Sequence, residues 1–189
     1  MRLKNFVIII IVIIFVLSVI FLPFILLKIT FKTTYKNIIK ENLLSIKLNS
    51  NELNTTLVLS VIKAESNFNK FALSNSDAYG LMQLKYSTAK EMANKLNFDI
   101  SVYDLYNEEI NIKLGINYLN YLFEIFNDKQ LVLMSYNAGL NKVKSWINNN
   151  ELTLNNGLYE TPFKETTNYL KRVLQNEKIY KLMGIKWNY

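Results

Sequence analysis

The side chain best placed for acid–base chemistry is Glu65, at the end of an apolar helical pattern. Four apolar residues lie eight, seven, four and three positions before it, on one face of a helix: Leu57, Val58, Val61 and Ile62. A carboxyl held against apolar side chains resists ionisation, so its pKa rises and it keeps a proton near neutral pH. A general acid needs this property. The alternative is a glutamate at the edge of the stripe with its carboxylate in water, as is usual for a single glutamate.

Further groups of residues accompany Glu65 along the chain. The first group is Ala64-Glu65-Ser66-Asn67-Phe68, Ser74, Gly80-Leu81-Met82-Gln83 and Thr88-Ala89. The next is Asn111-Ile112, Gly115 and Tyr118-Leu119. The last two are Ser135-Tyr136-Asn137-Ala138-Gly139 with Val143, and Pro162-Phe163 with Glu165-Thr166 and Asn168-Tyr169. Matches in residue type and spacing over several separate segments are far more specific than one short motif.

These groups closely resemble the signatures of the soluble lytic transglycosylases, in the family's order and over residues 35–180. The resemblance implies a mostly α, lysozyme-like helical domain. It also implies cleavage of the β-1,4 bond between N-acetylmuramic acid and N-acetylglucosamine in peptidoglycan, without water. In this reaction one carboxyl protonates the bridging oxygen and then takes the proton from the C6 hydroxyl, which leaves a 1,6-anhydro end. By matching positions, Glu65 is this acid and base.

The resemblance implies substrate-binding roles for three residues in the middle of the signatures. Ser74 and Gln83 match positions that contact sugar amides or hydroxyls, and Asn137 is expected to belong to the same substrate-binding set. Taken singly, a residue such as Ser74 is equally explained as an ordinary loop hydroxyl. The matched spacing of the whole set favours the site interpretation.

Three further residues are implied to lie close to the reacting sugar. Tyr136 matches a tyrosine near the catalytic carboxyl, and Glu165 and Tyr169 match residues on the far side of the groove. The structural alternatives are a core aromatic for Tyr136, helix packing for Tyr169 and a first-turn acid for Glu165.

The sequence also departs from the family pattern. Lys85-Tyr86 stands where the family usually has Met-Pro, and we expect Lys85 to alter a sugar subsite by contacting a carboxylate of the stem peptide or lactyl group. Asp77 replaces a common Gly, and Thr167 replaces a common Arg. These departures concern the subsites and not the catalytic glutamate.

The composition limits the chemistry that the chain can use. It contains no Cys and no His, which excludes disulfides, Cys or His nucleophiles and the usual zinc sites. We therefore expect no cofactor and no metal. The net charge is +7, but the basic residues are mostly single lysines, which predicts no nucleic-acid partner. A mildly positive surface suits anionic wall polymers or lipid headgroups, and is also typical of a solvated face.

Residues 6–27 form an uncharged run interrupted only by Ser18 and Pro23. As a helix this run spans ~33 Å, enough to cross a bilayer core of about 30 Å. We expect a transmembrane signal anchor here, behind a short cytoplasmic tail at residues 1–5. A cleaved signal peptide is the competing interpretation, but the run exceeds the usual apolar length and no small-x-small site follows it.

The charges that flank this run argue against the expected orientation. Arg2 and Lys4 precede it, whereas five lysines follow it: Lys28, Lys32, Lys36, Lys40 and Lys47. Charge counting alone places the C-terminal part in the cytoplasm. That rule weakens when a long folded domain follows, and the implied substrate lies outside. We therefore expect a single-pass protein of the cell membrane whose domain faces the cell wall.

After a juxtamembrane linker at residues 28–34, the pattern predicts a helical catalytic domain at residues 35–189. Expected helix starts and stops follow from capping residues: Asn54 or Thr55, a Thr88-x-x-Glu91 capping box, Asn107, Gly139, Asn141 and Pro162. Residues 70–79 are expected to be a loop, and residues 98–104 or 152–159 are the places for a short strand.

Three other functions remain open at this point. A muramidase of the same fold would let water attack the sugar. A non-catalytic peptidoglycan-binding or scaffold protein would keep the fold alone, but it would be expected to lose Glu65 first. An integral-membrane partner protein with an incidental outer domain would have no activity on the wall.

Overall fold

The computed structural model describes residues 2–184, without the side chains of residues 2–6, 8, 9 and 24. The chain divides into two compact units, Met1–Thr33 and Thr34–Tyr189. Residue 1 of the expected tail (1–5) and residues 185–189 of the expected domain (35–189) lie outside the described residues.

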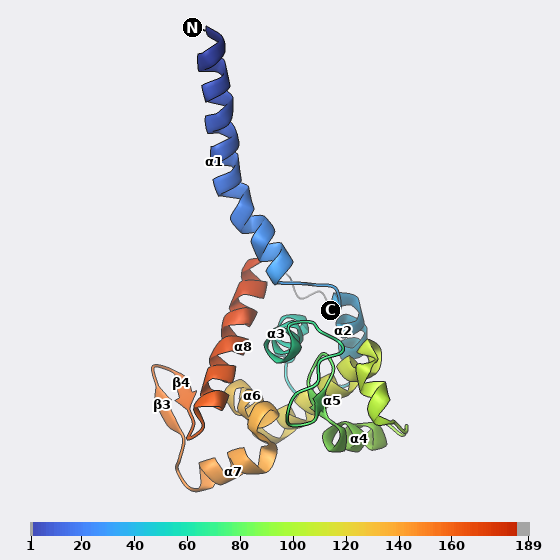
Figure 1. Ribbon diagram of the computed structural model, residues 1–189. Coiled ribbons are helices and arrows are strands. Elements are labelled where there is room, and N and C mark those ends of the chain that lie inside the picture. Colours follow the sequence, from blue (N-terminus) through green and yellow to red (C-terminus); the bar gives the residue numbers. More distant parts are fainter. Residues whose placement is uncertain (1, 185–189) are drawn as a thin grey trace. The chain divides into compact units, whose positions relative to one another are not determined.

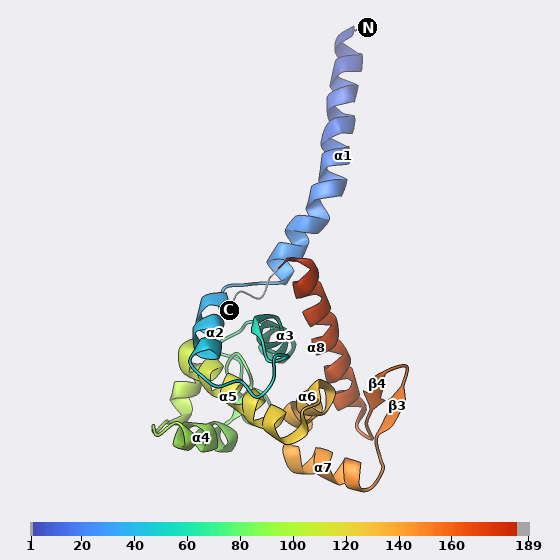
Figure 2. The same ribbon diagram turned by 180° about the vertical axis from the view of Figure 1, so that it is seen from behind.

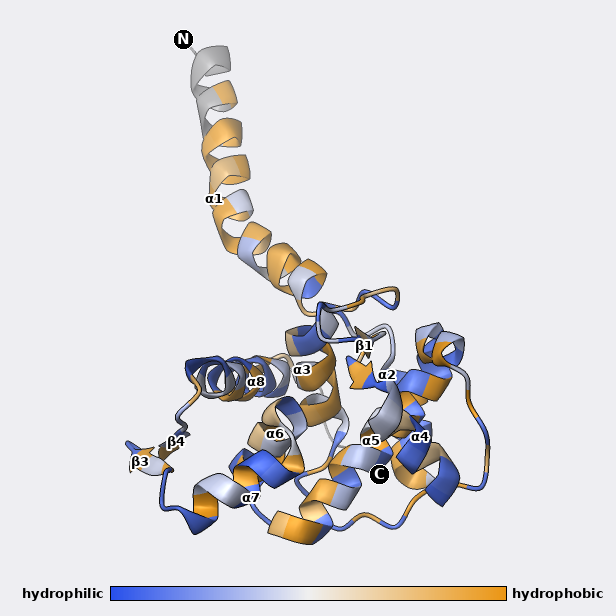
Figure 3. Ribbon diagram, turned by 60° about the horizontal axis from the view of Figure 1, so that its bottom comes forward, coloured by the Kyte–Doolittle hydropathy of each residue, from blue (hydrophilic) through white to orange (hydrophobic). Residues whose placement is uncertain are grey.

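The first unit consists mainly of α1 (Arg2–Thr30), an apolar helix with Pro23 inside it (Figure 3). Its segment Ile10–Thr30 is long and apolar enough to cross a membrane. Because α1 continues to Thr30, the first three residues of the expected linker (28–34) are helical.

The second unit is built from helices that pack in a closed ring (Figures 1 and 2). α3 (Thr55–Ser66) packs on α8 (Lys164–Leu182), and α8 packs on α6 (Lys129–Ala138). α6 packs on α5 (Glu108–Phe126), which contacts α2 (Lys36–Leu44), and α2 returns to α3. Fully buried apolar side chains from this ring form the core, among them Leu57, Val61, Leu119, Leu133, Leu170 and Val173. The expectation of a mostly helical domain is confirmed.

Smaller elements extend the ring on the side where the motifs lie. β1 (Ala78–Tyr79) pairs with β2 (Leu84–Lys85), and α4 (Tyr86–Lys95) follows at once and packs on α5. A 3-10 helix (Val102–Tyr106) leads into α5. α7 (Leu140–Asn148) packs on α6, and the hairpin of β3 (Thr153–Asn155) and β4 (Leu158–Glu160) leads to α8.

Local capping explains several helix ends, as the sequence predicted. The Asn54 side chain accepts a hydrogen bond from the backbone N–H of Leu57 at 2.9 Å, which caps α3. Asn107 caps α5 in the same way, accepting from Glu109 and Ile110. Gly139 ends α6 with a φ of 95°, a value that favours glycine.

Two local expectations were wrong. α4 begins at Tyr86 and not at a Thr88-x-x-Glu91 capping box, because Lys85 is held extended by its pairing with Ala78 and the helix starts directly after it. α7 begins at Leu140, directly after Gly139, so Asn141 does not start it. Of the two places expected for a short strand, residues 98–104 contain the start of the 3-10 helix and no strand, whereas residues 152–159 hold β3 and the first two residues of β4, which confirms the second place.

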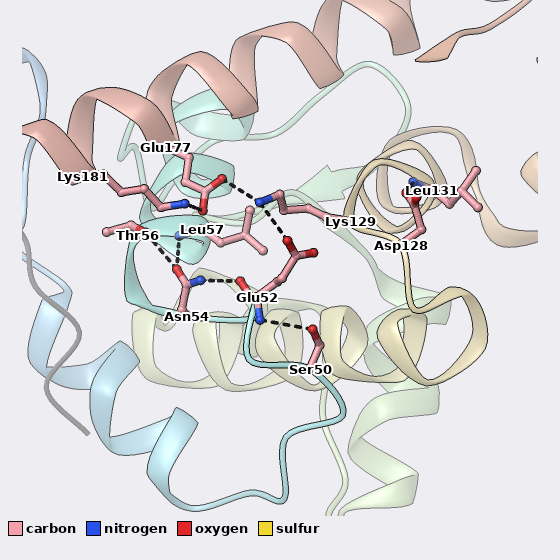
Figure 4. Close-up of polar contacts among 10 residues, drawn as sticks. All are labelled: Ser50, Glu52, Asn54, Thr56, Leu57, Asp128, Lys129, Leu131, Glu177 and Lys181. Carbon is pink, nitrogen blue, oxygen red and sulfur yellow. Dashed lines mark hydrogen bonds and ion pairs between the residues drawn. The ribbon is translucent and has the colours of Figure 1, made fainter. Parts of the chain in front are cut away.

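α3 and α8 run antiparallel, and an ion cluster ties them together near the start of α3 (Figure 4). Glu177 of α8 pairs with Lys129 of α6 at 3.3 Å and with Lys181 at 2.6 Å. Lys129 also pairs with Glu52, two residues before the Asn54 cap, at 3.3 Å. The cluster therefore fixes the starts of α3 and α6 against α8.

Candidate active site

Glu65 is the second-to-last residue of α3. The helix stops at Asn67, which adopts left-handed backbone angles (φ 48°, ψ 41°). The Asn67 backbone N–H donates a hydrogen bond to the Lys63 carbonyl. The next residue, Phe68, also has a positive φ and is buried, so the chain turns sharply after Glu65. All four apolar residues that predicted the helix face are fully buried: Leu57, Val58, Val61 and Ile62.

The surroundings of Glu65 favour its protonated form. Burial raises the pKa of the Glu65 carboxyl to about 7, and the nearby Glu165 carboxyl adds to this rise. The hydroxyl of Tyr169 and the guanidinium of Arg172 oppose the shift, because both stabilise a negative charge. Glu65 makes no ion pair with any residue that the structure describes.

Glu65 lines a cavity of about 440 Å³. Five of the six predicted substrate-binding residues line it as well: Ser74, Gln83, Tyr136, Asn137 and Glu165. They come from the loop after α3, the turn between β1 and β2, the end of α6 and the first turn of α8. Segments separated by up to a hundred residues in the chain therefore meet in one concave site.

The turn between β1 and β2 is held by buried groups of α5. The Asn111 side chain accepts a hydrogen bond from the Met82 N–H at 2.8 Å and donates to the Tyr79 and Leu105 carbonyls at 2.9 Å. A Cβ on Gly80 would lie 2.2 Å from the Leu105 oxygen, and a Cβ on Gly115 would lie 2.3 Å from the Met82 sulfur. At Gly80 the Leu105 backbone leaves no room for a side chain, so glycine is required, whereas at Gly115 the crowding atoms belong to the flexible Met82 side chain.

Two hydroxyls connect this turn to the catalytic region. Ser66, next to Glu65, donates to the Leu81 carbonyl at 2.7 Å, and Tyr136 donates to the Met82 carbonyl at 2.8 Å. The turn therefore cannot move without disturbing the end of α3 and the end of α6. The Tyr136 hydroxyl therefore donates its proton to the Met82 carbonyl and not to Glu65. The Glu65 carboxyl still lies close enough to raise the pKa of Tyr136, after the larger effect of burial.

The polar groups of Ser74 and Gln83 are partly used within the protein. The Ser74 hydroxyl accepts hydrogen bonds from the N–H groups of Ser76 and Ala78, so its own proton is left to donate into the cavity. The Gln83 amide donates to the Ala72 and Gly80 carbonyls at 3.1 and 3.0 Å, which leaves its oxygen to accept. One residue thus offers a donor and the other an acceptor.

Tyr169 lies behind Glu65 and is not among the residues that line the cavity. Its side chain is 1% exposed, and its hydroxyl has no hydrogen-bond partner of full geometry among the described residues. Burial and the adjacent Glu65 carboxyl raise the pKa of Tyr169 well above its usual value. Unlike Glu165, which is exposed in the cavity wall, Tyr169 faces the Glu65 carboxyl from the protein side.

The structure adds residues that were not among the predicted site residues, although two of them, Tyr118 and Phe163, belong to the motifs. Tyr118 lines the cavity and packs its ring 5.4 Å from that of Tyr136, and Lys142 and Phe163 line it from α7 and the start of α8. Arg172 acts on Glu65 from α8. Arg172 lies three and seven positions after Tyr169 and Glu165, so helical spacing alone could have placed it on their face.

The cavity continues into a second one of about 440 Å³. The two share five lining residues: Thr88, Tyr118, Ala138, Gly139 and Lys142. The second cavity adds Glu91 and Tyr121, from α4 and α5. Together they form an extended polar and aromatic surface, suited to a chain-like ligand more than to a single small molecule.

Two of the departures from the family pattern have structural roles. Tyr86 begins α4, a position where proline is favoured, and its hydroxyl donates to the Ile100 carbonyl at 3.0 Å. The Thr167 hydroxyl accepts a hydrogen bond from the Thr161 N–H at 2.9 Å and so fixes the entry into α8. Among the described side chains, no group of three or more Asp or Glu residues could hold a metal ion.

This arrangement is that of a lysozyme-like domain with one carboxyl of raised pKa in an elongated cavity. The same fold occurs in the 70 kDa soluble lytic transglycosylase of Escherichia coli, with a TM-score of 0.71 and 24% identity. The alignment covers 85% of this chain and 26% of that one. The expected fold class is thereby confirmed.

The sequence comparisons identify the family. The family model described as Transglycosylase SLT domain matches residues 42–156. The chain is 31% identical to the soluble lytic murein transglycosylase of Escherichia coli over 143 residues, which are 71% of this chain and 22% of that protein. It is 32% identical to the membrane-bound lytic murein transglycosylase C of Serratia proteamaculans over 151 residues, 67% and 42% of the two chains.

This protein therefore belongs to the Transglycosylase SLT domain family. It spans less than half of the length of these curated relatives, and about a quarter of the soluble ones.

Proposed function

We propose that this protein is a peptidoglycan lytic transglycosylase that cleaves the β-1,4 bond between N-acetylmuramic acid and N-acetylglucosamine. The observation that carries the proposal is Glu65, a buried carboxyl whose pKa is raised to about 7 and which lines an elongated cavity. The names of its relatives, lytic murein transglycosylases, support the same reaction.

In the proposed mechanism Glu65 acts twice. Its protonated carboxyl first donates a proton to the bridging oxygen, the glycosidic bond breaks, and positive charge develops at C1 of the muramyl sugar. The Glu65 carboxylate then takes the proton of the C6 hydroxyl while that oxygen bonds to C1, which closes the 1,6-anhydro ring. A pKa of about 7 suits both steps, because neither protonation state is strongly disfavoured near neutral pH. Tyr169 and Arg172 stabilise the carboxylate between the two steps.

A muramidase is the second candidate, and the position of Glu165 favours it. Ordinary glycosidases use two carboxylates across the scissile bond, one of them as nucleophile or as the base that activates water. Glu165 lines the same cavity as Glu65 and is close enough to raise its pKa. The transglycosylase mechanism needs no second carboxylate, since the substrate's own hydroxyl attacks.

The experiment that separates the two uses the full chain in detergent and purified peptidoglycan. Mass spectrometry of the fragments is expected to show 1,6-anhydro ends, which are one water lighter than hydrolysed ends. Glu165→Gln is expected to leave this product unchanged. Reducing ends that carry ¹⁸O after digestion in labelled water, and that disappear in Glu165→Gln, would establish the muramidase instead. If neither end is produced, the domain is a binding or scaffold module.

We further propose that α1 anchors the enzyme in the cell membrane, with the domain at Thr34–Tyr189 on the cell-wall side. The length and apolar character of Ile10–Thr30 support the anchor, and a substrate in the wall supports the orientation. The chain has no Cys, so a single introduced thiol reports its own side of the membrane. In intact spheroplasts a membrane-impermeant maleimide is expected to label Lys144→Cys and not Asn5→Cys. The reverse pattern would contradict the orientation.

A further inference from the structure

Two lysines in the cavity wall have no part in the acid–base chemistry of Glu65. Lys142 of α7 places its ammonium 4.5 Å from the centre of the Phe163 ring, where the aromatic face attracts it. The side chain of Lys85 makes no hydrogen bond, ion pair or ring contact with any residue that the structure describes. It is therefore a cation in the cavity whose partner is absent from the described part of the chain.

The backbone of Lys85 is nevertheless firmly held. Its Cα pairs with that of Ala78 across the two short strands. Leu84 before it is buried, and Tyr86 after it is tied to the Ile100 carbonyl. The ammonium is thus presented from a fixed position, in the same cavity wall as Ser74 and Gln83.

Two other lysines of this domain form ion pairs with glutamates. Lys70 meets Glu108 at 3.0 Å, and Lys129 meets Glu52 and Glu177, both at 3.3 Å. The cavity also contains two carboxyls, Glu65 and Glu165, but neither forms an ion pair with Lys85. Lys85 is therefore a charge in the cavity wall that pairs with none of the described acidic residues.

We infer that Lys85 binds a carboxylate of the glycan substrate and makes the enzyme selective for strands that carry free carboxyl groups. This inference rests on the proposed function. The lactyl group of a muramyl sugar ends in a carboxyl, which is free on a bare strand and is extended on a substituted strand by a peptide with carboxyls of its own. A bound strand displaces water from the cavity, and an ammonium–carboxylate hydrogen bond strengthens as water leaves.

The test compares the full chain in detergent on three substrates. These are strands with peptides, strands with the peptides removed and the lactyl carboxyls free, and peptide-bearing strands whose carboxyls have been amidated. Lys85→Met is expected to lower kcat/KM by about tenfold on carboxyl-bearing strands and to leave the amidated strands unaffected. Lys85→Arg is expected to retain most of the activity, and Lys178→Met, at an exposed position of α8, all of it. The first two substrates distinguish the lactyl carboxylate from the peptide carboxylates. Only the strand that carries the carboxylate bound by Lys85 shows the loss.

Equal losses on carboxyl-bearing and amidated strands, or no loss on either, would overturn the inference while the proposed function stands. If the wild-type chain cleaves none of the substrates, the proposed function fails. The role of Lys85 is then tested by measuring how tightly the chain binds the strands. In that case Glu65→Gln and Glu65→Gln/Lys85→Met are sedimented with each type of strand. About tenfold weaker binding of the double variant, confined to carboxyl-bearing strands, supports the inference, and equal binding refutes it.

Discussion

Two glutamates lie at opposite ends of the contact between α3 and α8, and their surroundings differ in charge. Glu177, near the start of α3, is 3% exposed and forms ion pairs with Lys129 and Lys181 (Figure 4). Glu65, at the end of α3, forms none with the described residues, and the nearest acid, Glu165, adds a like charge.

The difference shows how one helix pair holds both a structural carboxyl and the proposed catalytic one. The ammonium groups around Glu177 bind three separate segments together, so its contribution is to stability. Glu65 forms no ion pair with the described residues, and the opposing effects of Tyr169 and Arg172 are smaller than that of burial, so burial dominates its pKa. Because Glu65 forms no ion pair with the described residues, its carboxyl can exchange a proton, at some cost in stability.

The largest expected effect is on the activity of the unpaired carboxyl. Glu65→Gln keeps the shape of the side chain but can neither donate nor accept the transferred proton. Cleavage of purified peptidoglycan is expected to fall about 10³-fold, as measured by release of soluble fragments. Glu41→Gln, an exposed acid on α2, serves as the control and is expected to be fully active. Substantial cleavage by Glu65→Gln would show that another group is the acid.

The paired carboxyl is expected to affect stability instead. Glu177→Gln leaves Lys129 paired with Glu52 alone. The side chain of Lys129 is only 20% exposed. The free energy of unfolding is expected to fall by about 2–4 kcal/mol in urea titrations. The matched control is Glu91→Gln, which breaks the exposed pair with Lys95 and should cost less than about 0.5 kcal/mol. Equal effects of the two substitutions would show that the ion cluster contributes no more than a surface pair.

The raised pKa of Glu65 predicts a stability that depends on pH. The folded chain holds this proton up to about pH 7, whereas the ordinary value is 4.5. The stability that protonation contributes is therefore fully present below pH 4.5 and is lost as the pH rises to about 7. Glu65→Gln removes this dependence, so it should be more stable than wild type by about 1–3 kcal/mol at pH 8. Urea titrations at pH 4.5 and pH 8 measure the difference, and a constant difference would contradict the raised pKa.

The smallest expected effect concerns Tyr169, whose hydroxyl lowers the pKa of Glu65. Without that hydroxyl, in Tyr169→Phe, the pKa of Glu65 should rise. The loss of activity at alkaline pH follows deprotonation of the acid, so this limb of the kcat/KM profile should move up by roughly half to one pH unit. A role in substrate binding, as the sequence predicted for Tyr169, would instead raise KM and leave the limb in place.

Much of the fold follows from short-range patterns. The apolar spacing before Glu65, the caps at Asn54 and Asn107 and the glycine at 139 depend on neighbours within a few residues, so the sequence predicts them directly. The start of α4 could not be predicted in this way. Strand pairing between Lys85 and Ala78 sets it, and that pairing depends in turn on the buried Asn111 of α5.

The sequence by itself determined which carboxyl is the candidate acid and which residue types accompany it. Only the tertiary structure decided that Glu65 forms no ion pair with the described residues while Glu177 forms two, and that Tyr169 lies behind the carboxyl instead of in the cavity wall. The physical reason is that a pKa depends on burial and on charges brought near through space. Glu165, Tyr169 and Arg172 lie a hundred or more residues from Glu65 in the chain, and folding alone sets their distance from it.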